Sequence, residues 1–307
     1  MNRRRFLAAA SAAAASAGAA TAGKVRAADP AVRTFPVTGG TLSYRRFGET
    51  GPIHVLLSGG PGLESAYVDP IAVELSRERT VVVLDQRGTG ASRAAFGDGS
   101  QATVAGAVAD LDALRTALGQ TRLSLLGHSW GAMLSMAYAA AHGNNVASLA
   151  LLDPGGPDPT FAKAFGQIIE ARLTDADKNA ADATQQSGGQ GSLRAILPGY
   201  FHDHAKGVAY AAAMPQHYAN ADVSRAMFAD ISKHYDVNDA LRNATIPVLL
   251  VFGTDDPSRA AEAQLDALFP RATKVMIPDS GHFPWVENPT PFYAAIRTFL
   301  AKAPPPG

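Results

Sequence analysis

The pentapeptide Gly127-His128-Ser129-Trp130-Gly131 has the residue types of a covalent nucleophile carried on a tight turn. It fits the pattern G-x-S-x-G, in which the serine lies at a sharp turn from a strand into a helix and exposes its hydroxyl. Glycine is needed on both sides because a Cβ there would clash with the crossing strand and helix. The flanks agree, since an apolar run at 122–126 precedes the turn and small residues with helical periodicity follow at 132–141. We therefore predict that Ser129 is a nucleophile.

His282 is the residue that we predict to activate Ser129. A serine hydroxyl is a poor nucleophile at neutral pH and needs a base within hydrogen-bond reach. His282 lies just after the last apolar run, on a glycine-containing loop that can carry its side chain back over the sheet edge. His128 is too close in sequence to Ser129 to point where the base must be. The run His202-Asp203-His204 has no further ligand set at a useful spacing, so we predict no metal site.

An acidic side chain must hold the base in the correct tautomer and stabilise its charged form. Asp255 and Asp256 directly follow an apolar run at 247–252, so either could meet His282 at the sheet edge. We favour Asp256 from its offset to the preceding glycine, because Asp255 could instead bond to the backbone of the turn. Asp153 is a weaker candidate, since the Asp-Pro pair that it begins is also an ordinary strand-ending turn.

The segment Ser58-Gly59-Gly60-Pro61-Gly62 has the composition of a loop that presents bare backbone to a ligand. Backbone N–H groups can stabilise a developing oxyanion only if they approach it closely, and glycine permits that approach. The expected pair of donors is the N–H of Gly60 and the N–H of Trp130, the residue after the predicted nucleophile.

Strands and helices alternate on both sides of these residues. The runs 32–37 and 41–47 flank Thr38-Gly39-Gly40 and predict a hairpin. The later strands are continuously apolar, as strands buried in parallel sheets are. They are expected at 53–58, 80–84, 122–126, 146–152, 247–252 and 273–277, with helices at 66–77, 103–118, 132–143, 259–268 and 290–301.

The alternation stops between residues 154 and 243, where helical segments and loops predominate. We therefore predict an α/β fold with a mostly parallel sheet flanked by helices. Its core comprises 28–153 and 244–307, and a helical cap, 154–243, covers the strand ends where ligands bind in open sheets.

The first 27 residues resemble a twin-arginine export signal, with Arg3-Arg4-Arg5-Phe6-Leu7 before a mild apolar region. Residues 8–22 are too weakly apolar to span a membrane, and we expect no stable membrane anchor. Small residues at Val25 and Ala27 predict cleavage before Ala28. We expect the precursor to use the twin-arginine export machinery and the mature protein to be periplasmic or secreted.

Charge and cysteine content exclude several classes of protein. The formal net charge is zero, and removal of the basic signal segment would leave an acidic chain, so nucleic acid is not an expected partner. The chain has no cysteine, which excludes a disulfide framework.

Three motifs together resemble the prolyl iminopeptidase branch of the α/β hydrolases: GGPG at 59–62, DQRGTGAS at 85–92 and GHSWG at 127–131. The resemblance implies an α/β-hydrolase fold with an inserted helical cap and a triad in the chain order Ser129, Asp256, His282. It implies hydrolysis of an ester or amide of a small molecule or short peptide through an acyl-enzyme, without metal or cofactor. Release of an N-terminal residue is the first expectation. An exported carboxylesterase, lactonase or amidase is the alternative, and a non-catalytic binding protein on this fold is a remote one.

Two positions depart from the pattern of that branch. Ser58 replaces the first histidine of HGGPG, which could alter the support of the oxyanion loop. The iminopeptidases hold the free amine of the substrate with glutamates of the cap, whereas this cap contains nine aspartates and one glutamate, Glu170. Glu170 is therefore the candidate for binding the amine. In the DQRG motif, we expect Asp85 and Arg87 to support the site rather than perform chemistry.

Overall fold

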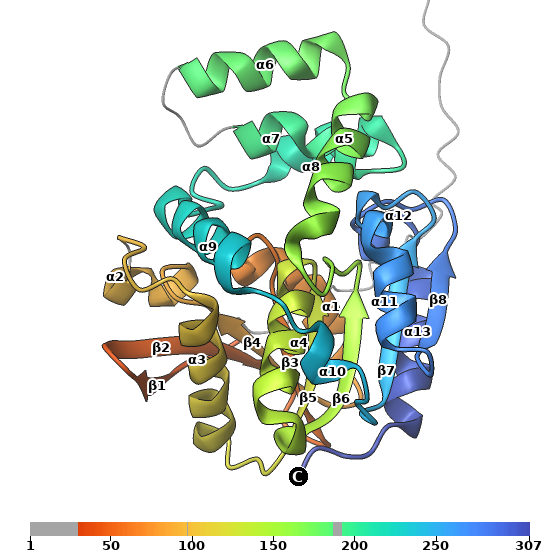
Figure 1. The fold of residues 1–307 in the computed structure, drawn as a ribbon. Helices are drawn as coiled ribbons and strands as arrows, with labels where there is room; N and C mark the ends of the chain where they lie inside the picture. The colour runs from red at the N-terminus through yellow and green to blue at the C-terminus, as the bar shows by residue number, and fades with distance from the viewer. Residues whose placement is uncertain (1–29, 97, 187–191) are drawn as a thin grey trace, which may run out of the picture. The chain divides into compact units, whose positions relative to one another are not determined.

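A sheet of eight strands in the order β1-β2-β4-β3-β5-β6-β7-β8 forms the centre of the protein in a computed structural model (Figure 1). Strand β2 pairs antiparallel with β1 and β4, and all other neighbours pair parallel. The structure describes residues 30–96, 98–186 and 192–307. The strands are β1 (Val32–Val37), β2 (Gly40–Phe47), β3 (Ile53–Leu57), β4 (Thr80–Asp85), β5 (Leu123–His128), β6 (Val146–Leu152), β7 (Val248–Gly253) and β8 (Thr273–Ile277).

The apolar runs predicted as buried strands form the middle of this sheet. Every residue of β4, β5, β6 and β7 is buried. Such strands lack the alternation of a half-exposed strand because helices cover both faces of the sheet. The predicted hairpin is confirmed, although Gly40 already pairs with Val37 and belongs to β2.

Helices cover the two faces of the sheet. The side chains of α1 (Asp69–Leu75) and α13 (Pro289–Lys302) pack on one face. Those of α3 (Val104–Ala117), α4 (Trp130–His142) and α11 (Glu262–Leu268) pack on the other. The short helices α2 (Arg93–Phe96), α10 (Asn238–Leu241) and α12 (Pro284–Glu287) complete this part of the chain. The helix predicted at 66–77 begins only at Asp69, because Pro70 suits the first turn of an α-helix, and a short 3₁₀ turn precedes it.

A run of helices separates β6 from β7, and it lies beyond the end of β6 in Figure 1. These helices are α5 (Ala162–Arg172), α6 (Asp175–Gln186), α7 (Ser192–Ile196), α8 (His204–Ala213) and α9 (Ala221–His234). None of the described residues between β6 and β7 belongs to a strand of the sheet. Buried residues of α9 and Leu241 of α10 belong to the same hydrophobic cluster as α4, so the last part of this segment packs on the core.

Hydrogen bonds join this helical cap to the loop that carries His282. The carboxylate of Glu287 accepts from the backbone N–H of Gly281 at 2.7 Å and from the backbone N–H of Asp203 at 2.9 Å. The guanidinium of Arg172 in α5 donates to the backbone carbonyl of Asp255. The cap is therefore held against the two loops that contain the predicted base and acid.

Within the described part of the chain, no helix has both the length and the apolarity needed to cross a bilayer. The predicted export signal, residues 1–27, lies outside the described residues.

Candidate active site

Ser129 occupies the turn between β5 and α4 with φ 55° and ψ −116°. A positive φ is unfavourable for serine, so the surrounding structure must impose it. A Cβ at Gly127 would lie 2.3 Å from the carbonyl oxygen of Gly131, and a Cβ at Gly131 would lie 2.3 Å from that of Leu57. The crossing backbones therefore leave no room for side chains at the two glycines of the motif. The backbone N–H of Ser129 donates to the carbonyl of Leu152 at 3.0 Å, which ties the turn to β6.

His282 and Asp256 form a buried pair. The imidazole Nδ1 of His282 lies 2.8 Å from Oδ1 of Asp256, and both residues are almost fully buried. The carboxylate of Asp256 also accepts from the backbone N–H of Ser258 at 2.8 Å and from the Ser258 hydroxyl. Burial by itself would raise the pKa of Asp256, but His282 and these hydrogen bonds lower it to about 2. Asp256 is thus an anion that faces the imidazole.

The two other candidate acids lie elsewhere. The side chain of Asp255 is 45% exposed, and its carboxylate lies 2.9 Å from Nδ1 of His202 in the cap. Asp153 is fully buried at the end of β6, where its Oδ1 accepts from the backbone N–H of Gly253 at 2.9 Å. Burial, and then the charge of Asp256, raise the pKa of Asp153 well above its usual value. The raised pKa favours the protonated form of Asp153, and its Oδ2 has no hydrogen-bond partner among the described residues.

The glycine loop after β3 passes directly over Ser129. A Cβ at Gly59 would lie 2.8 Å from the Cβ of Ser129. Gly60 has φ 124°, a conformation suited to glycine, and it precedes a cis bond to Pro61. Gly60, Ser129 and Trp130 line the same cavity, so the residues that carry the two predicted oxyanion donors share its wall with the predicted nucleophile.

Sequence reasoning missed a hydrogen-bonded chain that joins this glycine loop to His282. The backbone N–H of Gly59 donates to the Tyr67 hydroxyl at 2.5 Å, and that hydroxyl lies 2.7 Å from Nδ1 of His128. The Nε2 of His128 lies 2.9 Å from the backbone carbonyl of His282. A carbonyl can only accept, so His128 carries its proton on Nε2 and accepts from Tyr67 on Nδ1. Burial and the neighbouring His282 lower the pKa of His128 well below its usual value, which keeps the ring neutral.

Gln86 of the DQRG motif supports both sides of the predicted oxyanion site. Its Oε1 accepts from the indole N–H of Trp130 at 2.9 Å, and its Nε2 donates to the backbone carbonyl of Ser58 at 2.8 Å. The same Nε2 reaches Oγ of Ser58 at 3.2 Å. The serine that replaces the histidine of HGGPG is thus held mainly through its backbone.

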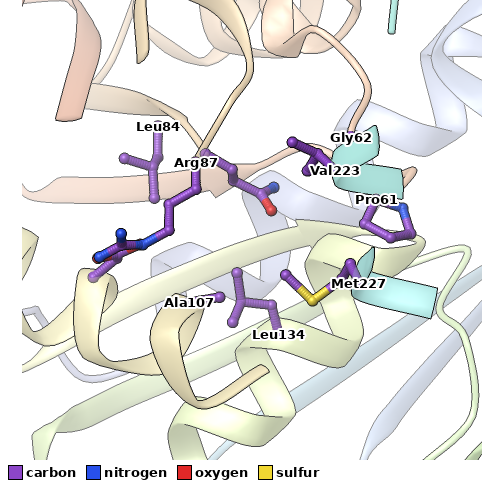
Figure 2. Close-up of a pocket in the computed structure, with 10 residues that line it drawn as sticks. Pro61, Gly62, Leu84, Arg87, Ala107, Leu134, Val223 and Met227 are labelled. Carbon is purple, nitrogen blue, oxygen red and sulfur yellow. The ribbon is translucent and has the colours of Figure 1, made fainter. Parts of the chain in front are cut away.

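Asp85 and Arg87 form ion pairs away from the reacting groups. Asp85 accepts from Arg45 at 2.6 Å, and Arg87 binds both carboxylate oxygens of Asp110, at 2.6 and 2.7 Å. Figure 2 shows Arg87 beside a small apolar space whose walls include Pro61 of the glycine loop. This space measures about 10 Å³, room for no more than a single water, and it marks packing rather than a ligand site.

A much larger cavity, of about 540 Å³, has Ser129 and His282 on its wall. Its size is that of a typical small-molecule site. Most of the wall is apolar or aromatic, and the cap contributes Phe161, Phe165, Leu197 and Ile231. Glu170 is exposed on α5 and is not among the described residues that line the cavity. The buried residue of that turn is its neighbour Ile169, so the helix directs the Glu170 position away from the packed side. The structure therefore does not bring the predicted amine ligand to the site.

Comparison with known proteins places this geometry in a family. Residues 54–289 match the sequence pattern of a family described as alpha/beta hydrolase fold. A proline iminopeptidase of Heyndrickxia coagulans is 26% identical over 282 residues, which cover 86% of this chain and 96% of the relative. Among solved structures, a proline iminopeptidase of Mycobacterium smegmatis aligns with a TM-score of 0.68 and 24% identity, covering 89% of this chain and 98% of that one. A thermophilic esterase from Thermogutta terrifontis aligns with a TM-score of 0.69 and 25% identity, covering 90% and 99%. The family model spans most of the chain, and the eight-stranded sheet and the serine turn fit it, so the protein belongs to the α/β-hydrolase fold family.

Proposed function

We propose that the protein is a serine hydrolase that cleaves an ester or amide bond through an acyl-enzyme. Oγ of Ser129 attacks the substrate carbonyl carbon while Nε2 of His282 takes the hydroxyl proton. The bond to the leaving group then breaks, and His282 returns the proton to that group. Water next attacks the acyl carbon by the same proton transfers, which releases the acid and restores Ser129.

Asp256 and the backbone donors have supporting roles in this mechanism. Asp256 accepts from Nδ1–H of His282, which leaves Nε2 unprotonated and able to take the proton of Ser129. The charge of Asp256 stabilises the imidazolium that forms. The N–H groups of Gly60 and Trp130 are the donors for the oxyanion of the tetrahedral intermediate. Every proton transfer and every bond change in these reaction steps uses only residues of the protein, the substrate and water.

One observation carries the proposal: a serine at positive φ and a histidine paired with a buried aspartate share the wall of one cavity. The curated relatives favour a proline iminopeptidase-like activity, the release of an N-terminal residue. The apolar cavity and the similarity to an esterase structure favour hydrolysis of an ester as a second candidate.

A fluorophosphonate probe tests the catalytic assignment. The wild type should be labelled at Ser129, and Ser129→Ala should lose labelling and hydrolysis while its melting temperature stays near that of the wild type. Activity should fall by about 10⁴ to 10⁶. Labelling that persists in Ser129→Ala would refute the nucleophile. A folded wild type that neither reacts with the probe nor hydrolyses any ester or arylamide would instead be a binding protein.

We also propose that the protein is exported by the twin-arginine route. This proposal rests on the Arg3-Arg4-Arg5 cluster and the alanine-rich stretch after it. Lysine at all three arginine positions should retain the precursor in the cytoplasm. N-terminal sequencing of the exported wild type should begin at Ala28, and a sequence that begins at Met1 would contradict cleavage.

A further inference from the structure

We infer that the substrate of this site is a neutral carboxylic ester or amide with an apolar acyl group and no free ammonium. The inference rests on the proposed function and names its substrate class. It separates two activities that the serine chemistry alone cannot distinguish, because an iminopeptidase and an esterase perform the same acyl transfer on substrates of different charge.

The cavity that has Ser129 on its wall is lined largely by apolar side chains. The first part of the cap contributes Phe161 and Phe165, and the later part contributes Leu197, Met214 and Ile231. Phe228 of α9 also lines the cavity and is 54% exposed, so an apolar residue lies where the cavity meets solvent. Such walls stabilise an apolar ligand by removing its surface from water.

Glu64 is the one acidic residue among the described residues that line this cavity, and its carboxylate is already engaged. It accepts from the backbone N–H of Gly90 and from the guanidinium of Arg93. Arg93 also donates to the backbone carbonyl of Ala219 at 3.1 Å, which holds it in place. Arg93 therefore already balances the negative charge of Glu64, and this carboxylate is not available to bind the ammonium of a substrate.

The amine ligand predicted from the sequence does not compensate for this arrangement. Glu170, the glutamate of the cap, is not among the lining residues. A protonated amine that enters the cavity would lose its hydration without gaining a free carboxylate, which is costly for an ammonium.

Two matched 4-nitrophenyl esters test the inference directly. Cyclopentanecarboxylate and L-proline esters have five-membered acyl rings that differ in one position, a CH₂ against an NH₂⁺. Each kcat/KM is divided by the ester's own rate of hydrolysis by hydroxide, which removes the difference in intrinsic reactivity. At pH 6, where the amine is protonated, the cyclopentanecarboxylate ester should be favoured by about 100-fold or more. The preference should narrow as the pH rises above about 8, where an α-amine loses its proton.

Equal or better turnover of the proline ester at pH 6 would overturn the inference and leave the serine mechanism intact. Failure of Ser129 to react with the fluorophosphonate probe, together with no hydrolysis of either ester, would overturn the proposed function and the inference with it. The two failures are therefore distinguishable in one set of measurements.

Three variants examine the role of Glu64. Arg93→Gln releases the Glu64 carboxylate, so the relative kcat/KM for the proline ester should rise by about tenfold. Glu64→Gln should change kcat/KM for the two esters in parallel, so that the ratio of the two values changes by less than about threefold. A selective loss of the proline ester in Glu64→Gln would show that Glu64 binds the amine, and would overturn the inference. Glu170→Gln is the matched control at a carboxylate outside the cavity. Its ratio of kcat/KM for the two esters should equal that of the wild type.

Discussion

Nε2 of His128 lies 2.9 Å from the backbone carbonyl oxygen of His282. The residue before the proposed nucleophile therefore forms a hydrogen bond to the backbone of the residue proposed as its base. The same imidazole is bonded through Tyr67 to the backbone N–H of Gly59. The loop that supplies an oxyanion donor and the loop that supplies the base are therefore connected by one neutral ring. We regard His128 as a positioning residue, because it acts through these two loops.

Substitution of His128 should lower kcat more than it raises KM. His128→Leu removes both hydrogen bonds and leaves the buried carbonyl of His282 without its donor, a loss of about 1–3 kcal/mol. We expect kcat to fall by about 10- to 100-fold, with KM changed by less than about threefold. His128→Asn can still accept from Tyr67 and should give an intermediate kcat. Steady-state kinetics on a single ester would decide the matter, and wild-type kcat in His128→Leu would remove the positioning role.

Asp256→Asn should inactivate the enzyme far more than Asp255→Asn. The amide of asparagine favours the wrong tautomer of His282, and the same change in a serine-protease triad costs on the order of 10⁴-fold in kcat. Asp255 bonds to His202 at the surface, so its substitution should change kcat by less than about threefold. The two variants serve as controls for each other, and the reverse ranking would identify Asp255 as the acid.

Asp153→Asn should stabilise the protein at neutral pH while retaining activity. The pKa of Asp153 is raised in the folded protein, so the unfolded chain loses this proton at a lower pH than the folded chain does. The folded wild type therefore loses stability as the pH rises from about 4 toward the folded-state pKa. Asparagine cannot ionise, can still accept from the backbone N–H of Gly253, and tolerates the positive φ of this position.

The difference in unfolding free energy between Asp153→Asn and the wild type should be about 1 kcal/mol or more at pH 7 and should vanish below about pH 4. Denaturant unfolding at several pH values measures it. Asp153→Ala, which removes the acceptor for the backbone N–H of Gly253 at the start of the loop that carries Asp256, should lose activity several-fold. A stability difference that does not depend on pH would contradict a neutral Asp153 in the folded state.

Gln86→Leu should cost more activity than Ser58→Ala. Gln86 bonds to the indole of Trp130 and to the backbone of Ser58, so leucine would release both sides of the oxyanion site. We expect a loss in kcat of about tenfold, a fraction of the 10²- to 10³-fold typical for loss of a donor itself. Ser58→Ala removes a bond of 3.2 Å and leaves the backbone bond in place, so kcat should stay within about twofold. Equal losses in the two variants would mean that the Ser58 hydroxyl supports the loop.

Local patterns in the sequence were sufficient to predict the sheet and the serine turn. The strands are short apolar runs, and the turn depends on glycines two residues from Ser129, so every determinant lies within a few residues of its effect. The α/β-hydrolase fold, which is built from these local elements, could be predicted for the same reason, and this prediction is confirmed. His282 could be placed at the sheet edge because it directly follows the last strand.

The choice among acids and the content of the cavity depended on tertiary structure. Asp255 and Asp256 are adjacent in sequence, and only the packing of the chain places one against His282 and the other against His202 in the cap. Composition suggested Glu170 as an amine ligand, but the direction of a helical side chain depends on which face the helix buries. The chemistry of a buried or partly buried group depends on hydrogen-bond partners from other parts of the chain. His128 and Glu64 show this most clearly, because their bonds to His282 and Arg93 cross 154 and 29 positions of the chain.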